Sequence, residues 1–152
     1  MKNVLFVWLI VVFTLCGCAH SKHIQQAASP VQQNASLQIA KEALDTVFTT
    51  YRSYESKTFE RIVSPDFVPD RLLFLGIVDS GFSSGTIIDM QFLIIHATQK
   101  NTNLDVVFTW KKEKIPYSQD NKPIMQKGKT QFIFKNTDSK WLLAEVKGDS
   151  PF

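Results

Sequence analysis

The chain has 152 residues, of which 44% are hydrophobic, and this length supports one globular domain with a buried core rather than two. Its 17 Lys and Arg against 14 Asp and Glu leave a formal net charge of +3. The later lysines, Lys111, Lys112, Lys114, Lys127 and Lys129, have no Arg among them, and strand alternation spreads them over both faces, which argues against a nucleic-acid-binding surface.

An apolar run from Val4 to Leu15 follows a single positive charge at Lys2. The run is shorter than the roughly 20 apolar residues that cross a bilayer, so it predicts a signal peptide. It ends in Leu15-Cys16-Gly17-Cys18, which resembles the lipobox of bacterial lipoprotein precursors. The resemblance implies cleavage before Cys18 and lipid attachment, including palmitate, to its sulfur. An ordinary secretory signal and an uncleaved anchor with a buried cysteine remain as alternatives.

The expected organisation is a signal peptide over 1–17, a lipidated Cys18 with a flexible tether over 18–35, and one domain over 36–152. Few large apolar side chains occur in the tether, which cannot offset its conformational entropy by burial. Cleavage leaves one cysteine, already lipidated, so no disulfide is expected. Ala19, rather than Asp, follows Cys18 and implies the periplasmic side of the outer membrane if the host is Gram-negative.

Three helices are expected in the first part of the domain. Ser36 caps a predicted helix over 36–53 whose apolar residues recur at three- and four-residue intervals. A shorter helix begins at Ser56, carries Phe59, Ile62 and Val63 on one side, and ends at Ser64-Pro65. Residues 71–82 fit either a buried strand or a helix begun by Asp70, and we favour the helix.

The remaining chain changes from helical to strand periodicity. Four long strands are predicted over 86–99, 103–116, 124–136 and 140–148, each bounded by turn residues. Alternation in the second and third strands places Phe108 and Trp110, then Phe132 and Phe134, on a buried face.

Helices followed by an antiparallel meander predict an α+β domain whose helices cover one face of a curved sheet. This order, with the strands 128–134 and 140–146, resembles the nuclear transport factor 2-like superfamily over about residues 36–148. The resemblance implies a cone-shaped fold. Some members, such as ketosteroid isomerase, limonene epoxide hydrolase and scytalone dehydratase, are enzymes that work inside the cone, whereas others bind ligands, act as transport adaptors or are structural.

An isomerase-type site needs a carboxylate base and a proton donor across an apolar cavity. The residues that could supply such groups are Asp89, Asp105, Glu145, Tyr51 and Tyr54. Alternation directs Asp105 to solvent, and Asp89 lies beside a Ser-Gly turn that water reaches. Glu145 alternates with Trp141 and Leu143, which favours an inward-facing side chain and makes it the strongest of these catalytic candidates. The preferred interpretation is still that the carboxylates are solvated or lie at the rim of the cone.

Aromatic residues on the strand faces either line a cavity or fill the core, and core filling is the more common role. The residues considered as pocket lining are Phe92, Phe108, Trp110, Phe132, Trp141 and Glu145. His96 is expected to be a partly buried or edge histidine, because no companion ligands accompany it. No metal and no cofactor are expected, and His20 and His23 of the tether form no site.

The sequence therefore predicts a membrane-tethered, non-catalytic ligand-binding or interaction module. Its expected partners are the membrane, through the lipid on Cys18, and an envelope protein or small apolar ligand, with no nucleic acid. The lysines of the later strands are interpreted as a solvated surface rather than a headgroup-binding one. The alternatives are a small hydrolase or isomerase with its site inside the cone, and an assembly factor whose sheet edge or open sheet face pairs with another envelope protein or a second copy of itself.

Overall fold

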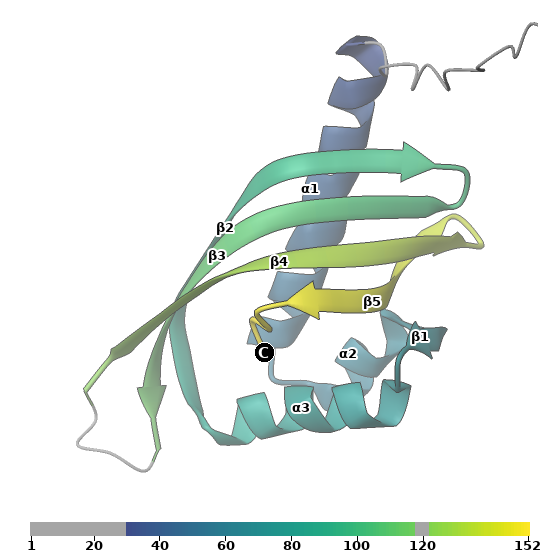
Figure 1. The fold of residues 1–152 in the computed structure, drawn as a ribbon. Helices are drawn as coiled ribbons and strands as arrows, with labels where there is room; N and C mark the ends of the chain where they lie inside the picture. Colours follow the sequence, from purple (N-terminus) through teal and green to yellow (C-terminus); the bar gives the residue numbers. More distant parts are fainter. Residues whose placement is uncertain (1–29, 118–121) are drawn as a thin grey trace, which may run out of the picture.

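The computed structural model describes residues 30–117 and 122–152, in which helices pack against one curved sheet (Figure 1). The helices are α1 (Pro30–Arg52), α2 (Ser56–Arg61) and α3 (Arg71–Ser83), and the strands are β1 (Val63–Val68), β2 (Gly85–Lys100), β3 (Asn103–Pro116), β4 (Ile124–Thr137) and β5 (Lys140–Gly148). The expected signal peptide, Cys18 and residues 18–29 of the expected tether lie outside the described residues. Within the described ranges, no helix is both long and apolar enough to cross a membrane.

Helix α1 begins at Pro30, six residues before the expected start at Ser36. Proline suits the first helical position, because its φ is already helical and its missing N–H would have no partner there. Residues 30–35, expected in the tether, are therefore helical, and Ser36 is buried within the helix rather than capping it. The predicted apolar stripe is confirmed, with Leu44 and Tyr51 among its buried members.

The second helix is shorter than expected, because Val63 begins a strand that the sequence pattern did not reveal. Helix α2 ends at Arg61, and β1 pairs in parallel with β5, with Val63 opposite Leu143. Pro65 is tolerated because β1 is an edge strand, where a missing N–H interrupts no ladder.

Helix α3 confirms the helical interpretation of residues 71–82. The Asp70 carboxylate caps it by accepting a 2.9 Å hydrogen bond from the Leu73 amide. Phe74, Val78 and Phe82 face the core, whereas Leu72 is 77% exposed on the outer side of the helix.

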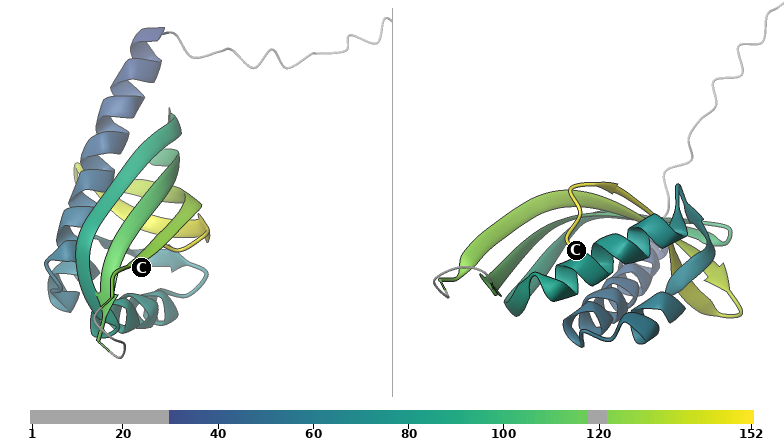
Figure 2. Two further views of the ribbon diagram at one scale, coloured as in Figure 1. Left: turned by 90° about the vertical axis from the view of Figure 1, so that its left-hand side faces the viewer. Right: turned by 90° about the horizontal axis from the view of Figure 1, so that it is seen from below.

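The five strands lie in the order β1-β5-β4-β3-β2, and the four predicted strands are confirmed to within one residue at each end. Figure 2 shows the sheet curving over the helices, which lie on its concave face. Phe48 of α1 contacts this face, with ring centroids 5.2 Å from Phe92 and 5.8 Å from Phe108. Gly128 allows Trp110 and Asp149 to pack against the strand, since a Cβ there would lie 2.7 Å from the Trp110 ring and 2.6 Å from the Asp149 Cβ.

We predict that Phe108→Ala and Phe132→Ala each lower the free energy of unfolding by about 3 to 5 kcal/mol. Both side chains are fully buried and contact each other edge to face, at a centroid distance of 4.8 Å. Chemical denaturation measures the loss. Leu93→Ala is the matched control, because Leu93 is 70% exposed on the outer face and its truncation should cost less than about 0.5 kcal/mol. Equal losses for Leu93 and Phe108 would contradict the assignment of faces.

Candidate functional site

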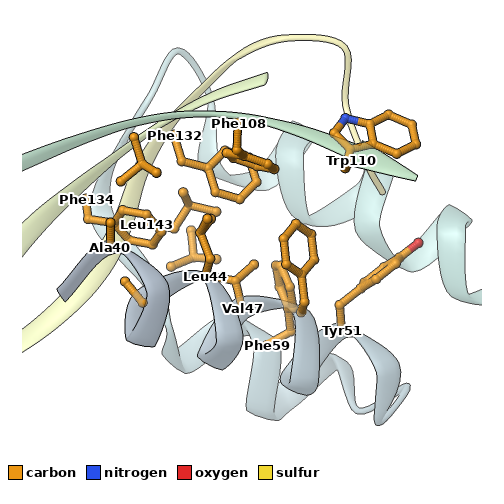
Figure 3. Close-up of a cluster of buried hydrophobic side chains, with 14 of the residues drawn as sticks. Ala40, Leu44, Val47, Tyr51, Phe59, Phe108, Trp110, Phe132, Phe134 and Leu143 are labelled. Carbon is orange, nitrogen blue, oxygen red and sulfur yellow. The ribbon is translucent and has the colours of Figure 1, made fainter. Parts of the chain in front are cut away.

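The middle of the concave face is filled by apolar side chains, as Figure 3 shows. Phe108, Phe132 and Phe134 are fully buried there and pack with Leu44 and Leu143. Phe108 and Phe132, which were considered as pocket lining, are therefore core residues. Trp141 is only half-buried and packs against the edge of the same cluster.

The carboxylates of the sheet do not face this interior. Asp89 is exposed and accepts a 2.7 Å hydrogen bond from Gln91 Nε2. Asp105 lies on the outer face, where Gln131 Nε2 donates to both of its oxygens at 2.9 and 2.8 Å. Both positions agree with the expectation of solvated carboxylates.

Glu145 is also on the outer face, and the expectation that it points inward is wrong. The register between β4 and β5 shifts at this point, so that Leu143 lies opposite Phe134 but Glu145 lies opposite Ile133. This irregularity reverses the alternation that simple strand geometry predicts. The carboxylate pairs with Lys147 Nζ at 3.1 Å.

A shallow groove of about 580 Å³ lies on the outer face of the sheet and includes Phe92 and Trp110 in its lining. Its rim carries exposed Lys111, Lys127 and Lys129. Lys111 and Lys127 are directly opposite each other on β3 and β4. Like charges at paired positions of neighbouring strands repel each other. These lysines agree with the expected solvated surface.

Two other lysines of β3 are buried on the concave side, which the sequence reasoning missed. Lys112 is 3% exposed and Lys114 is 8% exposed. They continue the inward row of Phe108 and Trp110 at two-residue intervals, and this spacing was the signal that could have located them.

The Lys112 ammonium lies among ring faces and a single carbonyl. Its Nζ donates a 2.7 Å hydrogen bond to the Pro151 carbonyl oxygen and lies 5.7 Å from the Tyr51 ring centroid and 5.9 Å from that of Trp110. No carboxylate pairs with it among the described residues. Burial, with a smaller contribution from the positive charge of Lys114, lowers the pKa of Lys112 to about 8.

Polar groups from three elements surround this end of the cone. Lys114 Nζ donates to the Ser84 hydroxyl at the end of α3. Tyr51 of α1 is buried, and this burial, with a smaller contribution from Tyr54, raises its pKa above the usual range. The Tyr54 hydroxyl accepts a hydrogen bond from the Ile87 amide.

Residues 149–152 close this end of the cone, and the end of the ribbon lies between the sheet and α3 in Figures 1 and 2. The Phe152 ring contacts four buried aromatic rings at centroid distances of 5.0 to 5.9 Å, namely those of Tyr51, Phe59, Phe74 and Phe132. The space beside Lys112 is thus occupied by the chain itself.

No acidic side chain is buried with these lysines. The buried polar or charged residues of the described ranges are Ser36, Ser64, Lys112, Lys114 and Thr130. The interior therefore offers cationic donors, which bind anions, and aromatic side chains, which pack against apolar groups, but no carboxylate base. His96, on the edge strand β2, is exposed and bonds to Thr98, and no group of three His, Cys, Asp or Glu side chains in the described residues is placed to hold a metal ion.

No protein-family model matches the chain, and comparison with curated proteins finds no match. Solved structures do match. A nuclear transport factor 2-like superfamily protein from Salmonella enterica is 7% identical with a TM-score of 0.62, and the match covers 78% of this chain and 93% of that one. A ketosteroid isomerase-like protein from Erwinia carotovora atroseptica is 13% identical with a TM-score of 0.60, covering 78% and 99%. A nuclear transport factor 2-like protein of unknown function from Shewanella oneidensis is 10% identical with a TM-score of 0.55, covering 75% and 98%.

These similarities confirm that the chain has the nuclear transport factor 2-like α+β fold, with five strands where about four were expected. At this level of identity they show the fold alone. The fold carries different functions in different proteins, so any function of this chain must be argued from its own side chains.

We predict that raising the pH from about 7.5 to about 10 stabilises the domain through Lys112. Between its folded pKa of about 8 and its ordinary value of 10.5, the unfolded chain holds the proton and the folded chain does not, so the free energy of unfolding rises with pH. Denaturant unfolding at several pH values measures this slope. Lys112→Met should remove it, and Lys111→Met, which deletes the neighbouring outward charge, should keep it. Identical slopes in the unchanged chain and Lys112→Met would contradict the buried position of the ammonium.

Proposed function

We propose that the chain is a membrane-tethered, non-catalytic binding module of the bacterial envelope. The observation that carries the binding role is the character of the interior, which holds two buried lysines and no buried acid among the described residues. An acid-base site of the isomerase type requires a carboxylate within an apolar cavity. Here Asp89, Asp105 and Glu145 are all on the outer side of the molecule.

The tether is supported by the Leu15-Cys16-Gly17-Cys18 motif at the end of a short apolar run. A lipid on Cys18 would place the domain at a membrane surface, and Ala19 favours the outer membrane in a Gram-negative host. The distance between Cys18 and the start of α1 at Pro30 is 12 residues, a span of up to about 40 Å when extended. A lipid on Cys18 would thus hold the start of α1 within about this distance of the membrane.

A role in envelope assembly is the second candidate, and one feature favours it. Strand β2 is an edge strand of 16 residues, and its exposed side chains include Ile88, Leu93 and Ile95. A long apolar edge strand can pair with a strand of another protein. Crosslinking from Ile95 to a second envelope protein in cells would favour assembly over ligand binding.

We predict that Cys18→Ser abolishes incorporation of labelled palmitate and leaves the precursor uncleaved. The reason is that diacylglycerol transfer and the following cleavage both depend on the thiol of this cysteine. Metabolic labelling followed by electrophoresis measures both effects. Cys16→Ser is the matched control, since it retains the acceptor thiol and should be labelled normally. Unchanged labelling of the Cys18 variant would contradict the tether, and recovery of the unchanged protein in the inner membrane would contradict the outer-membrane assignment.

We also predict that Glu145→Gln leaves the cellular role intact. This change keeps the shape of the side chain and deletes a charge that, in the structure, is paired with Lys147 on the outer face. Complementation of a deletion strain measures the outcome, with Asp89→Asn as the comparison variant. Loss of function in Glu145→Gln, with normal export and thermal stability, would favour the enzyme interpretation instead.

A further inference from the structure

A groove of about 560 Å³ runs between α3 and the last residues of the chain. Exposed Leu72 and Leu73 lie at one side, while Ser84 and Phe152 form part of its wall. Ser84 is the hydrogen-bond acceptor of Lys114 Nζ, and Phe152 directly follows Pro151, the acceptor of Lys112 Nζ. The wall of the groove is therefore bonded to Lys114 through Ser84, and its residue Phe152 is the chain neighbour of the residue bonded to Lys112.

The segment 149–152, which fills the interior, is anchored at its first residue, Asp149. The Asp149 carbonyl oxygen accepts hydrogen bonds from Trp110 Nε1 at 3.2 Å and from the Thr130 hydroxyl. The Asp149 amide donates to the Lys129 carbonyl at 3.1 Å, and the Asp149 carboxylate accepts a 3.1 Å hydrogen bond from the Lys129 amide. Asp149 is thus fixed to β4 by several bonds.

The residues after Asp149 are held by far fewer polar contacts. The 2.7 Å bond from Lys112 Nζ to the Pro151 carbonyl is the one hydrogen bond that joins residues 150–152 to the rest of the described chain. The other contacts are the ring contacts of Phe152, which is only half-buried. We name Ser150–Phe152 the plug, because it fills the interior next to the firmly bonded Asp149 but makes few polar contacts of its own.

We propose that the space around Lys112 is a binding site for a small apolar carboxylic acid, and that such an acid enters along the groove and displaces the plug. This inference rests on the proposed binding role but not on the membrane tether. The Pro151 carbonyl oxygen marks the position of a ligand oxygen on Lys112, and the Phe152 ring marks the position of the ligand's apolar group.

The chemistry favours an acid over a neutral ligand. Lys112 bonds to a neutral carbonyl, and no carboxylate pairs with it among residues 30–117 and 122–152. Replacing that carbonyl by a carboxylate turns the hydrogen bond of a cation to a neutral acceptor into an ion pair, in which the donor and the acceptor carry opposite charges. The second buried ammonium, on Lys114, adds to the positive field at this end of the cone.

The covalent path within the plug gives the length of the ligand. Three atoms, Cβ, Cα and N of Phe152, separate its ring from the Pro151 carbonyl carbon, and 4-phenylbutyrate has three methylenes between its ring and its carboxyl carbon. This acid can therefore place a ring and a carboxylate where the plug places a ring and a carbonyl. The alcohol 4-phenylbutanol has the same ring and chain without the charge and is the matched neutral probe.

The experiment measures binding of both probes to the full chain by isothermal titration calorimetry, in one detergent buffer for every variant. Phe152→Ala weakens the plug, so it should bind 4-phenylbutyrate about tenfold more tightly than the unchanged chain does. Adding Lys112→Met to Phe152→Ala should weaken binding of the acid by about tenfold or more while leaving binding of the alcohol nearly unchanged. Adding Lys111→Met, which deletes the neighbouring outward charge, should have no effect on either probe.

Three results would overturn the inference. The first is acid binding that does not increase in Phe152→Ala. The second is an equal loss of acid and alcohol binding on adding Lys112→Met, which would indicate an apolar pocket without an anion site. The third is loss of cooperative thermal unfolding in Phe152→Ala, since a displaceable segment must be dispensable for folding. None of these results affects palmitate labelling or the Glu145→Gln test, so failure of the site is distinguishable from failure of the proposed function.

Discussion

Burial of the Lys112 ammonium is the constraint on which the end of the cone closed by residues 149–152 depends. An isolated charge in an apolar interior is costly unless polar groups replace its hydration. Here the replacement comes from the Pro151 carbonyl and from the faces of Tyr51 and Trp110. The indole is held in turn by its 2.8 Å bond to the Thr130 hydroxyl. The Lys112 side chain of β3 therefore contacts α1 and the last residues of the chain, and β4 supports the indole beside it.

The concave face is divided into two parts with different roles. Phe108, Phe132 and Phe134 form a well-packed apolar core beneath α1, and this part of the face stabilises the domain. Beyond Trp110 the same row of β3 continues with lysines, and the interior becomes cationic and aromatic. Because a fold does not by itself imply a function, any function of this chain must be argued from the side chains that occupy such parts of it.

Periodicity predicted much of the fold because burial on one side of an element imposes a regular pattern on its sequence. The long strands and α3 were predicted for this reason. The pattern failed where local geometry breaks it: β1 is too short to show alternation, and the register shift in β5 turns Glu145 outward. It also failed at Lys112 and Lys114, because a lysine on an inward position is assumed to reach solvent, whereas here other parts of the chain cover it.

The parallel pairing of β1 with β5 has a consequence for how the chain folds. The partner of β1 is separated from it by about eighty residues, and β5 is the inner neighbour that joins β1 to the rest of the sheet. Such non-local pairing slows folding, because the entropy of closing a long loop is lost before the contacts form. A nascent chain cannot complete this sheet until its final strand has emerged. For the proposed export route, the topology delays compaction, which helps to keep the polypeptide extended until it has passed through a translocation channel.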